Sequence, residues 1–181
     1  MKDLPHLRFS LASYAARWPD ETDTLYFAQL LDVGVDAFHR EHTAAHFTAS
    51  AWLVSGDSQR VLLTHHRKLN RWLQLGGHAD GDLDLERVAL REAQEESGID
   101  ALRSEPAMFD VDRHRIPARG DEPEHWHYDV RYIVRADDEQ FAVGEESLDL
   151  QWCDITAIAN DEASDASLRR MARKWLERDG D

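Results

Sequence analysis

Residues 76–99 read GGHADGDLDLERVALREAQEESGI, and this stretch decides the fold that the rest of the chain must support. It contains Glu92, Glu95 and Glu96, which have the spacing of one helical turn. Side chains three and four residues apart are neighbours on a helix, so these carboxylates are expected within an arc of about 100°. Close like charges repel one another, whereas hard divalent cations such as Mg²⁺ bind oxygen ligands and share them with phosphates. The spacing therefore indicates either a metal site for attack on a phosphoanhydride or a solvated acidic helix face.

The residues around the glutamates favour the metal site. Gly76 and Gly77 precede the helix, and Gly98 follows it where a left-handed C-terminal cap is expected. The stretch resembles the Nudix box, whose pattern is G-x5-E-x7-R-E-U-x-E-E-x-G-U, with U an aliphatic residue. Gly77 occupies the first glycine of that pattern. The other residues that fall in register are Arg91, Glu92, Ala93, Glu95, Glu96, Gly98 and Ile99.

The chain departs from the pattern at Leu83, where the family has a glutamate. In the family that glutamate supports the loop and the box arginine, so Arg91 needs another partner, for which Asp82 and Asp84 are candidates. If Asp84 is the N-cap of the helix, Leu83 and Val88 stand at the two positions of a hydrophobic staple. Because the change removes no expected metal ligand, we expect hydrolytic activity to survive it.

The resemblance implies a set of metal-binding and catalytic residues. Glu92, Glu95 and Glu96 are expected to bind Mg²⁺ or Mn²⁺, with the backbone carbonyl of Gly77 as a further ligand. Glu95 and Glu96 are expected to be essential for catalysis. The general base of such enzymes lies in the box or in a later loop. Glu145 and Glu146 both match the later position, and Glu146 is favoured; an exposed loop acid is the alternative interpretation of either residue.

Histidine is the second unusual feature, with ten residues in the chain. In a strand over HWHYDVRYIV, His127, Asp129 and Arg131 would share one face, where Arg131 could pair with phosphate and His127 could donate a hydrogen bond. His125 and His127 could instead bind a transition metal together with imidazoles from elsewhere. The candidate substrate contacts, each with a core, surface or solvated-loop role as the alternative, are Arg131, His127, His78, Arg67 and Trp126.

Composition limits the class of protein. The chain has 181 residues, 42% of them hydrophobic, which suits one globular domain with a core. Lysine and arginine total 21 and aspartate and glutamate total 36, so the net charge of −15 argues against a nucleic-acid polymer as partner. A small phosphorylated substrate is still compatible, because a bound metal sets the local field. One cysteine excludes an internal disulfide, and the absence of a signal-peptide core or a membrane-length apolar run indicates the cytoplasm.

Hydrophobic periodicity gives the expected order of elements. Helices are predicted over residues 7–18 and 24–33, with Asp20 and Thr22 as candidate caps of the second. A C-terminal amphipathic helix is predicted within residues 164–179. The predicted strands cover residues 47–54, 60–66, 106–116 and 125–134, with others near WLQLGG and LDLQWCDI.

Strands on both sides of a central helix indicate an α/β protein, an α/β/α sandwich with a mixed sheet, which is also the fold that the Nudix resemblance implies. We expect a single domain over residues 1–181, with an N-terminal helical extension over 1–43 and the Nudix core over 44–178. The extension could cover one edge of the domain, close over the substrate or form a homodimer contact.

The function expected from the resemblance is divalent-metal-dependent hydrolysis of a phosphoanhydride. The substrate would be a nucleoside diphosphate linked to another moiety, or a related organic pyrophosphate. A non-catalytic Nudix-fold module that senses a nucleotide is one alternative, favoured by Leu83 alone. A metal-dependent phosphomonoesterase that uses the same acidic cluster is the other.

Overall fold

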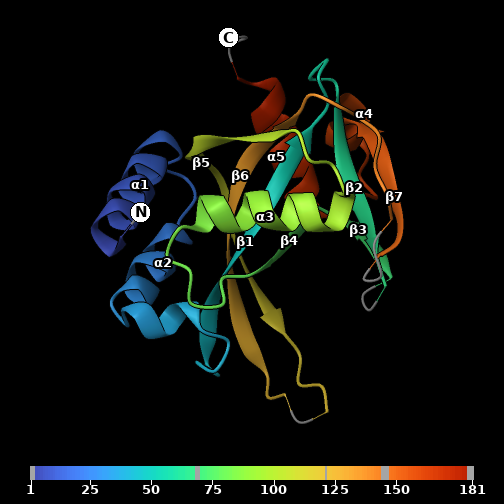
Figure 1. The fold of residues 1–181 in the computed structure, drawn as a ribbon. Helices are drawn as coiled ribbons and strands as arrows, with labels where there is room; N and C mark the ends of the chain where they lie inside the picture. The colour runs from blue at the N-terminus through green and yellow to red at the C-terminus, as the bar shows by residue number, and fades with distance from the viewer. Residues whose placement is uncertain (1–2, 68–69, 121, 144–146, 179–181) are drawn as a thin grey trace. The chain divides into compact units, whose positions relative to one another are not determined.

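The computed structural model describes residues 3–67, 70–120, 122–143 and 147–178 (Figure 1). Its helices are α1 (Leu4–Arg17), α2 (Thr24–Leu31), the 3-10 helix η1 (Val35–Phe38), α3 (Leu85–Ser97), α4 (Ile155–Asn160) and α5 (Ala166–Leu176). Its strands are β1 (Ala45–Val54), β2 (Arg60–His66), β3 (Arg71–Leu73), β4 (Leu75–His78), β5 (Leu102–Ile116), β6 (His125–Ala136) and β7 (Ser147–Asp154). None of the helices in the described part of the chain is long and apolar enough to cross a membrane.

The strands form one sheet, in the order β3-β2-β1-β6-β5, with β4 paired to β1 and β7 paired to β2. The predicted hairpin of β1 and β2 is confirmed as an antiparallel pair with Val54 opposite Val61. Strand β2 also pairs antiparallel with β7, from Arg60 opposite Asp154 onward. The predicted class, a mixed sheet combined with helices and preceded by an N-terminal helical extension, is confirmed.

Two details of the predicted elements are wrong. Helix α4 was not predicted, because six residues are too few to show a helical period, although Asp154 caps it by accepting the Ala157 amide at 2.7 Å. The expected caps of α2, Asp20 and Thr22, do not cap it: the helix follows Asp23, whose side chain makes no capping bond.

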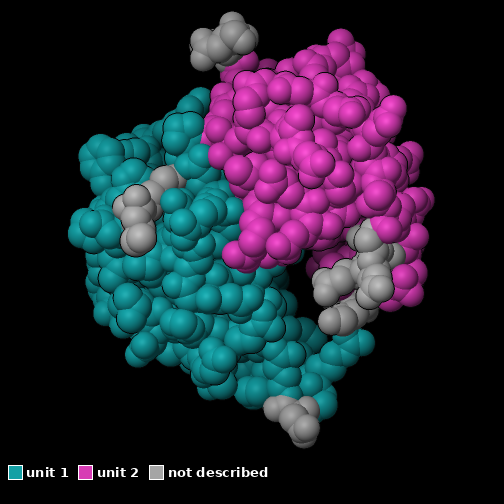
Figure 2. Space-filling model, in the orientation of Figure 1, with its two compact units in different colours: residues 1–50, 76–89, 106–132 teal, residues 51–75, 90–105, 133–181 magenta. Residues whose placement is uncertain are grey.

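The chain divides into two compact units (Figure 2). Unit 1 comprises residues 1–50, 76–89 and 106–132, and unit 2 comprises residues 51–75, 90–105 and 133–181. Helix α3 contributes its first turn and a half to unit 1 and the remainder, with the acidic residues, to unit 2. The assignment of residues 1–181 to a single domain stays a prediction.

The core of unit 1 is built from the N-terminal helices and the sheet. Helices α1 and α2 lie side by side (Figure 1), and α1 buries Leu7, Leu11 and Tyr14. The ring of Phe27 on α2 packs 5.0 Å from that of Tyr128 on β6. These contacts place the N-terminal extension within the core of unit 1.

The core of unit 2 joins α3 to the strands. Ala93 of α3 packs in one buried cluster with Leu62 of β2 and Leu150 of β7. Helix α5 begins at a cap in which the Asp165 carboxylate accepts the Ser167 amide at 2.9 Å. Glu105 pairs with both Arg135 and Arg178 at 2.8 Å, which links the C-terminal helix region to β5 and β6 within this unit.

Candidate active site

Helix α3 starts where the sequence predicted a staple. The Asp84 carboxylate accepts the Arg87 amide at 3.4 Å, so Asp84 is the N-cap residue. Leu83 is partly buried and packs against the cluster that contains Val88, as the staple requires. Asp82 pairs with the Arg87 guanidinium at 2.7 Å, next to the cap. Leu83 therefore has a packing role in the loop where the family pattern has a glutamate.

Gly98 ends α3 in the predicted left-handed conformation, with φ of +68°. Its amide donates to the Gln94 carbonyl at 2.8 Å, which closes the last turn. The C-terminal cap therefore fixes the last turns of the helix, which contain Glu92, Glu95 and Glu96.

These three glutamates, Glu92, Glu95 and Glu96, are named here the acidic face of α3. The side chain of Glu92 is 18% exposed and that of Glu95 is 64% exposed, while Glu96 is half-buried. Arg91 donates to the Glu92 carboxylate at 2.8 Å and lies 4.0 Å from that of Glu95. The carboxylate oxygens of this face are the ligands that a hard divalent cation prefers. The donor set of this face therefore fits such an ion.

The glycine pair at the start of the box, Gly76 and Gly77, lies in β4, in unit 1. A Cβ atom on Gly76 would overlap the Ser50 hydroxyl oxygen and stand 2.7 Å from the Ala49 carbonyl oxygen, so only glycine fits there. Gly77, the predicted carbonyl ligand, follows it in β4 and is half-buried.

Unit 1 also contains a buried row of polar side chains on β1 and β6, named here the polar face. Arg131 is 2% exposed and pairs with Asp129 at 2.7 Å, Asp110 at 3.0 Å and Asp112 at 3.4 Å. Burial alone would lower the pKa of Arg131, but these carboxylates outweigh it and raise the pKa. The members of the polar face are His46, Thr48, Ser50, His127, Asp129 and Arg131.

Strand β1 completes the hydrogen bonding of this face. The hydroxyl of Thr48 donates to Asp129 at 3.0 Å and that of Ser50 donates to it at 2.9 Å. The predicted alternation of β6 is confirmed, since Tyr128 and Val130 pack in the apolar cluster of unit 1. Because the Arg131 guanidinium is already matched by carboxylates, the structure favours a stabilising role for it over the predicted phosphate contact.

Five histidines gather at one end of the polar face. The ring of His127 lies 4.8 Å from that of His46, 5.0 Å from those of His78 and His125, and 5.5 Å from that of His114. Burial lowers the pKa of His46 to about 4 and that of His127 to about 2, and neighbouring imidazoles act in the same direction. Burial also lowers the pKa of His78. These three rings are therefore neutral at physiological pH.

His46 was not among the candidate residues predicted from the sequence. A signal was present, because His46, Thr48 and Ser50 alternate with Phe47 and with alanines along β1, which is the pattern of a strand with one polar face. Pairing of β1 with β6 then brings His46 beside His127.

Similarity to known proteins identifies the family of this chain. Residues 44–175 match the model of the NUDIX domain. The chain belongs to the Nudix family. A search of curated protein sequences gave no significant match.

Solved structures of Nudix proteins share the fold. A NUDIX-family hydrolase from Clostridium perfringens is 25% identical, with a TM-score of 0.55 over 72% of this chain and 96% of that one. A MutT NUDIX hydrolase from Burkholderia pseudomallei is 21% identical, with a TM-score of 0.56 over 72% and 97%. A C. elegans Ap4A hydrolase, solved as a binary complex, is 17% identical, with a TM-score of 0.53 over 72% and 94%.

The family match makes the chain a Nudix hydrolase, an enzyme that acts on pyrophosphate-containing substrates. Enzymes of this family generally use a divalent metal, and their substrates are small phosphorylated molecules. The choice of Mg²⁺ or Mn²⁺, the cytoplasmic location and the homodimer stay predictions.

The remaining candidate residues lie in different surroundings. Trp126 is 37% exposed, and the Arg113 guanidinium lies 4.7 Å from its ring centroid. Arg67 is exposed in the turn after β2, and His78 is half-buried in β4. Glu146, the predicted general base of this Nudix enzyme, lies outside the described residues.

Proposed function

We propose that this Nudix enzyme is a Mg²⁺- or Mn²⁺-dependent pyrophosphohydrolase that cleaves a nucleoside diphosphate linked to another moiety, or a related organic pyrophosphate. The observation that carries the proposal is the acidic face of α3, with three carboxylates in box register and Glu95 64% exposed. The C. elegans neighbour is an Ap4A hydrolase, and its substrate falls in the same broad class of phosphoanhydrides.

In this proposal, the residues of the box have different roles in metal binding. Glu92, Glu95 and Glu96 hold the cation, with the Gly77 carbonyl as a further ligand. Arg91 fixes the Glu92 carboxylate through its contact at 2.8 Å, which orients that ligand. When bound, the cation supplies charge neutralisation at the phosphoanhydride and activation of the attacking water.

The substrate contacts are proposed from exposure and chemistry. Arg67 is exposed and offers a forked donor to phosphate, and Trp126 offers a partly exposed ring for a flat group such as a base. His78 and His127 remain candidate hydrogen-bond donors to phosphate. Glu146 is proposed as general base from its sequence position. Glu146→Gln tests it, and Glu145→Gln tests the other candidate; the variant of the base should lose more turnover.

A product screen tests the function. The purified protein is incubated with Mg²⁺ or Mn²⁺ and a panel of diphosphate-linked compounds, dinucleotides and phosphomonoesters, and the products are separated by chromatography. We expect metal-dependent release of two phosphorylated halves from at least one diphosphate-linked compound. Release of inorganic phosphate from a monoester alone would instead identify a phosphomonoesterase.

Two charge variants assign the cleavage to the acidic face. Glu95→Gln and Glu96→Gln should each lower turnover by about 10²-fold or more, because the metal-bound transition state loses a fixed charge. The matched control is Glu162→Gln, which removes the same charge from an exposed turn of unit 2 and should leave turnover unchanged. Equal turnover in all three variants would refute the metal assignment, and metal-independent binding without cleavage would indicate a sensing module.

A further inference from the structure

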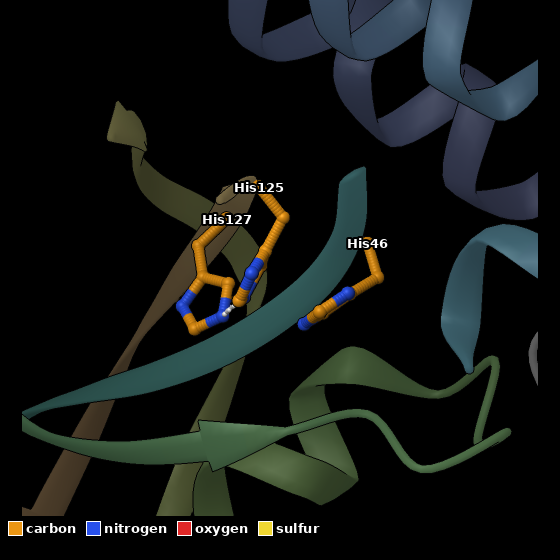
Figure 3. A group of neighbouring side chains, drawn as sticks. All are labelled: His46, His125 and His127. Carbon is orange, nitrogen blue, oxygen red and sulfur yellow. Dashed lines mark hydrogen bonds between the residues drawn. The ribbon is translucent and has the colours of Figure 1, made fainter. Parts of the chain in front are cut away.

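The proposed function uses His78 and His127 only as single hydrogen-bond donors and does not explain why histidines converge in unit 1. One ring nitrogen each from His46, His125 and His127 lies within 4.8 Å of the other two. Figure 3 shows the ring of His46, from β1, directed toward the rings of His125 and His127 on β6. Among the described residues, no other group of three histidine, cysteine, aspartate or glutamate side chains brings its ligand atoms this close together.

The outer hydrogen bonds of two rings fix which nitrogen faces the group. Nδ1 of His125 lies 2.9 Å from the Pro123 carbonyl oxygen, and Nδ1 of His46 lies 3.4 Å from that of His42. A carbonyl oxygen can only accept, so each Nδ1 carries the hydrogen and donates it. In a neutral ring, Nε2 then has a bare lone pair. Hydrogen bonds of this kind orient the imidazoles of metal-binding histidines.

The spacing of two of these ring nitrogens matches that of ligands on one metal ion. Nε2 of His125 lies 3.1 Å from Nε2 of His127. Two nitrogens bound to tetrahedral Zn²⁺ at about 2.05 Å stand about 3.3 Å apart, which is close to this distance. Nε2 of His46 is buried and has no hydrogen-bond partner among the described residues. A cation between the three rings would satisfy that atom.

We propose that His46, His125 and His127 form a binding site for a divalent transition-metal ion of the Zn²⁺ type, built from residues distinct from the acidic face of α3. Imidazole nitrogens select such ions, whereas Mg²⁺ prefers oxygen ligands. Two of the three ligands, His46 and His125, are 2% and 3% exposed, so the packing of the fold holds their rings in place.

The surroundings define the rest of the coordination shell. The His78 ring lies 5.2 Å from that of His46 and 5.0 Å from that of His127, and a Glu122 carboxylate oxygen lies 3.8 Å from Nε2 of His125. Three imidazoles, with a fourth position for water or one of these side chains, form a normal zinc arrangement. Bound there, the ion would tie β1 to β6 within unit 1.

The competing account is a hydrogen-bonded imidazole cluster without a metal. A single hydrogen shared between His125 and His127 would explain their distance of 3.1 Å. It would not provide a partner for Nε2 of His46, which burial separates from solvent. The metal site accounts for both observations.

Retention of Zn²⁺ tests the proposal. The full chain is stripped with a chelator, given Zn²⁺ in the presence of excess Mg²⁺ to saturate oxygen sites, dialysed, and analysed for metal. We expect about one zinc per chain in the wild type and in Glu95→Gln. His46→Asn and His125→Asn should each lose it, because asparagine can keep the Nδ1-type hydrogen bond but lacks the Nε2 ligand. His6→Asn, on the exposed side of α1, is the matched control and should retain it.

A second measurement on the wild type does not depend on how the variants fold. Co²⁺ in place of Zn²⁺ should give the intense visible absorption of a tetrahedral nitrogen site, without a thiolate charge-transfer band. No retained zinc, a weak octahedral Co²⁺ spectrum, or zinc lost from Glu95→Gln but kept by both histidine variants would each overturn the proposal. If the histidine variants do not fold, the Co²⁺ spectrum alone decides.

Discussion

The polar face of unit 1 and the acidic face of α3 in unit 2 both concentrate charged side chains, but they differ in how far these side chains are buried and paired. The polar face is buried, and Arg131 at 2% exposure is matched by the carboxylates of Asp110, Asp112 and Asp129. The acidic face leaves the side chain of Glu95 64% exposed, and the Arg91 guanidinium lies as far as 4.0 Å from that carboxylate. Charges that the fold matches internally hold it together, whereas charges that it leaves exposed are available to a ligand.

The largest expected effect is the loss of stability on removing the buried guanidinium. Arg131→Ala should lower the free energy of unfolding by about 3–5 kcal/mol, because it leaves buried carboxylates without their counter-charge. Urea unfolding monitored by circular dichroism measures this loss. Arg103→Ala, which breaks an exposed pair with Asp137, is the control and should have little effect on stability.

The same variant separates the two roles considered for Arg131. The sequence predicted a phosphate contact, in which case Arg131→Ala would raise KM for the substrate at unchanged stability. The buried ion pairs predict the reverse. A normal unfolding curve together with a raised KM would therefore show that Arg131 binds substrate, and that the polar face is not purely stabilising.

Two glycines of the box region provide the second comparison. Gly76→Ala should destabilise the protein by about 1–3 kcal/mol, because the added Cβ would meet the Ala49 carbonyl oxygen at 2.7 Å, where a backbone atom cannot yield cheaply. Gly98→Ala should cost about 1–2 kcal/mol for a different reason, since its φ of +68° is unfavourable for a side chain.

Asparagine distinguishes these causes. Gly98→Asn should cost less than Gly98→Ala, because asparagine tolerates the left-handed conformation, while Gly76→Asn should be worse than Gly76→Ala. Thermal unfolding of the four variants measures the order. An improvement on going to asparagine at position 76 would show that its constraint is conformational rather than steric.

The two faces also differ in how far the sequence could predict them. Glu92, Glu95 and Glu96 lie within one turn of a single helix, so their spacing alone placed them on one face. Gly98 and the Asp84 cap were predictable for the same reason, because each is a local device. Local periodicity carries this information without any knowledge of the tertiary fold.

The histidine group could not be predicted in the same way. His46 and His127 are far apart in the sequence, and their rings come together at 4.8 Å only because β1 pairs with β6. The matching of Arg131 by Asp110 likewise depends on the register of β5 against β6. Alternation along a strand indicates which side chains share a face, but strand order decides what they meet.

Leu83 gives a smaller effect that tests the departure from the family pattern. Leu83→Glu restores the glutamate of the Nudix box but should lower stability by about 1–2 kcal/mol, because Leu83 packs on the core beside Val88. Turnover should not rise. Leu83→Ala is the matched control, which removes the packing without adding charge. A rise in turnover with no loss of stability would show that the missing glutamate limits this enzyme.

The smallest effect concerns the acidic face itself. Without metal, Glu95→Gln should raise stability by about 0.2–0.5 kcal/mol, because it removes repulsion from Glu92 and Glu96, whereas the contact with Arg91 that it weakens is already as long as 4.0 Å. This corresponds to about 1 °C in Tm, which is measurable by calorimetry in the presence of a chelator.

Addition of Mg²⁺ should reverse the order of the two proteins. Under the proposed metal assignment, the ion should raise the Tm of the wild type by mass action, whereas the variant lacks one proposed ligand and should gain less. Glu162→Gln should follow the wild type in both conditions. If Glu95→Gln were less stable than the wild type in the chelator as well, the attraction between Arg91 and Glu95 would outweigh the repulsion between the glutamates. The contrast with the polar face would then be one of exposure alone.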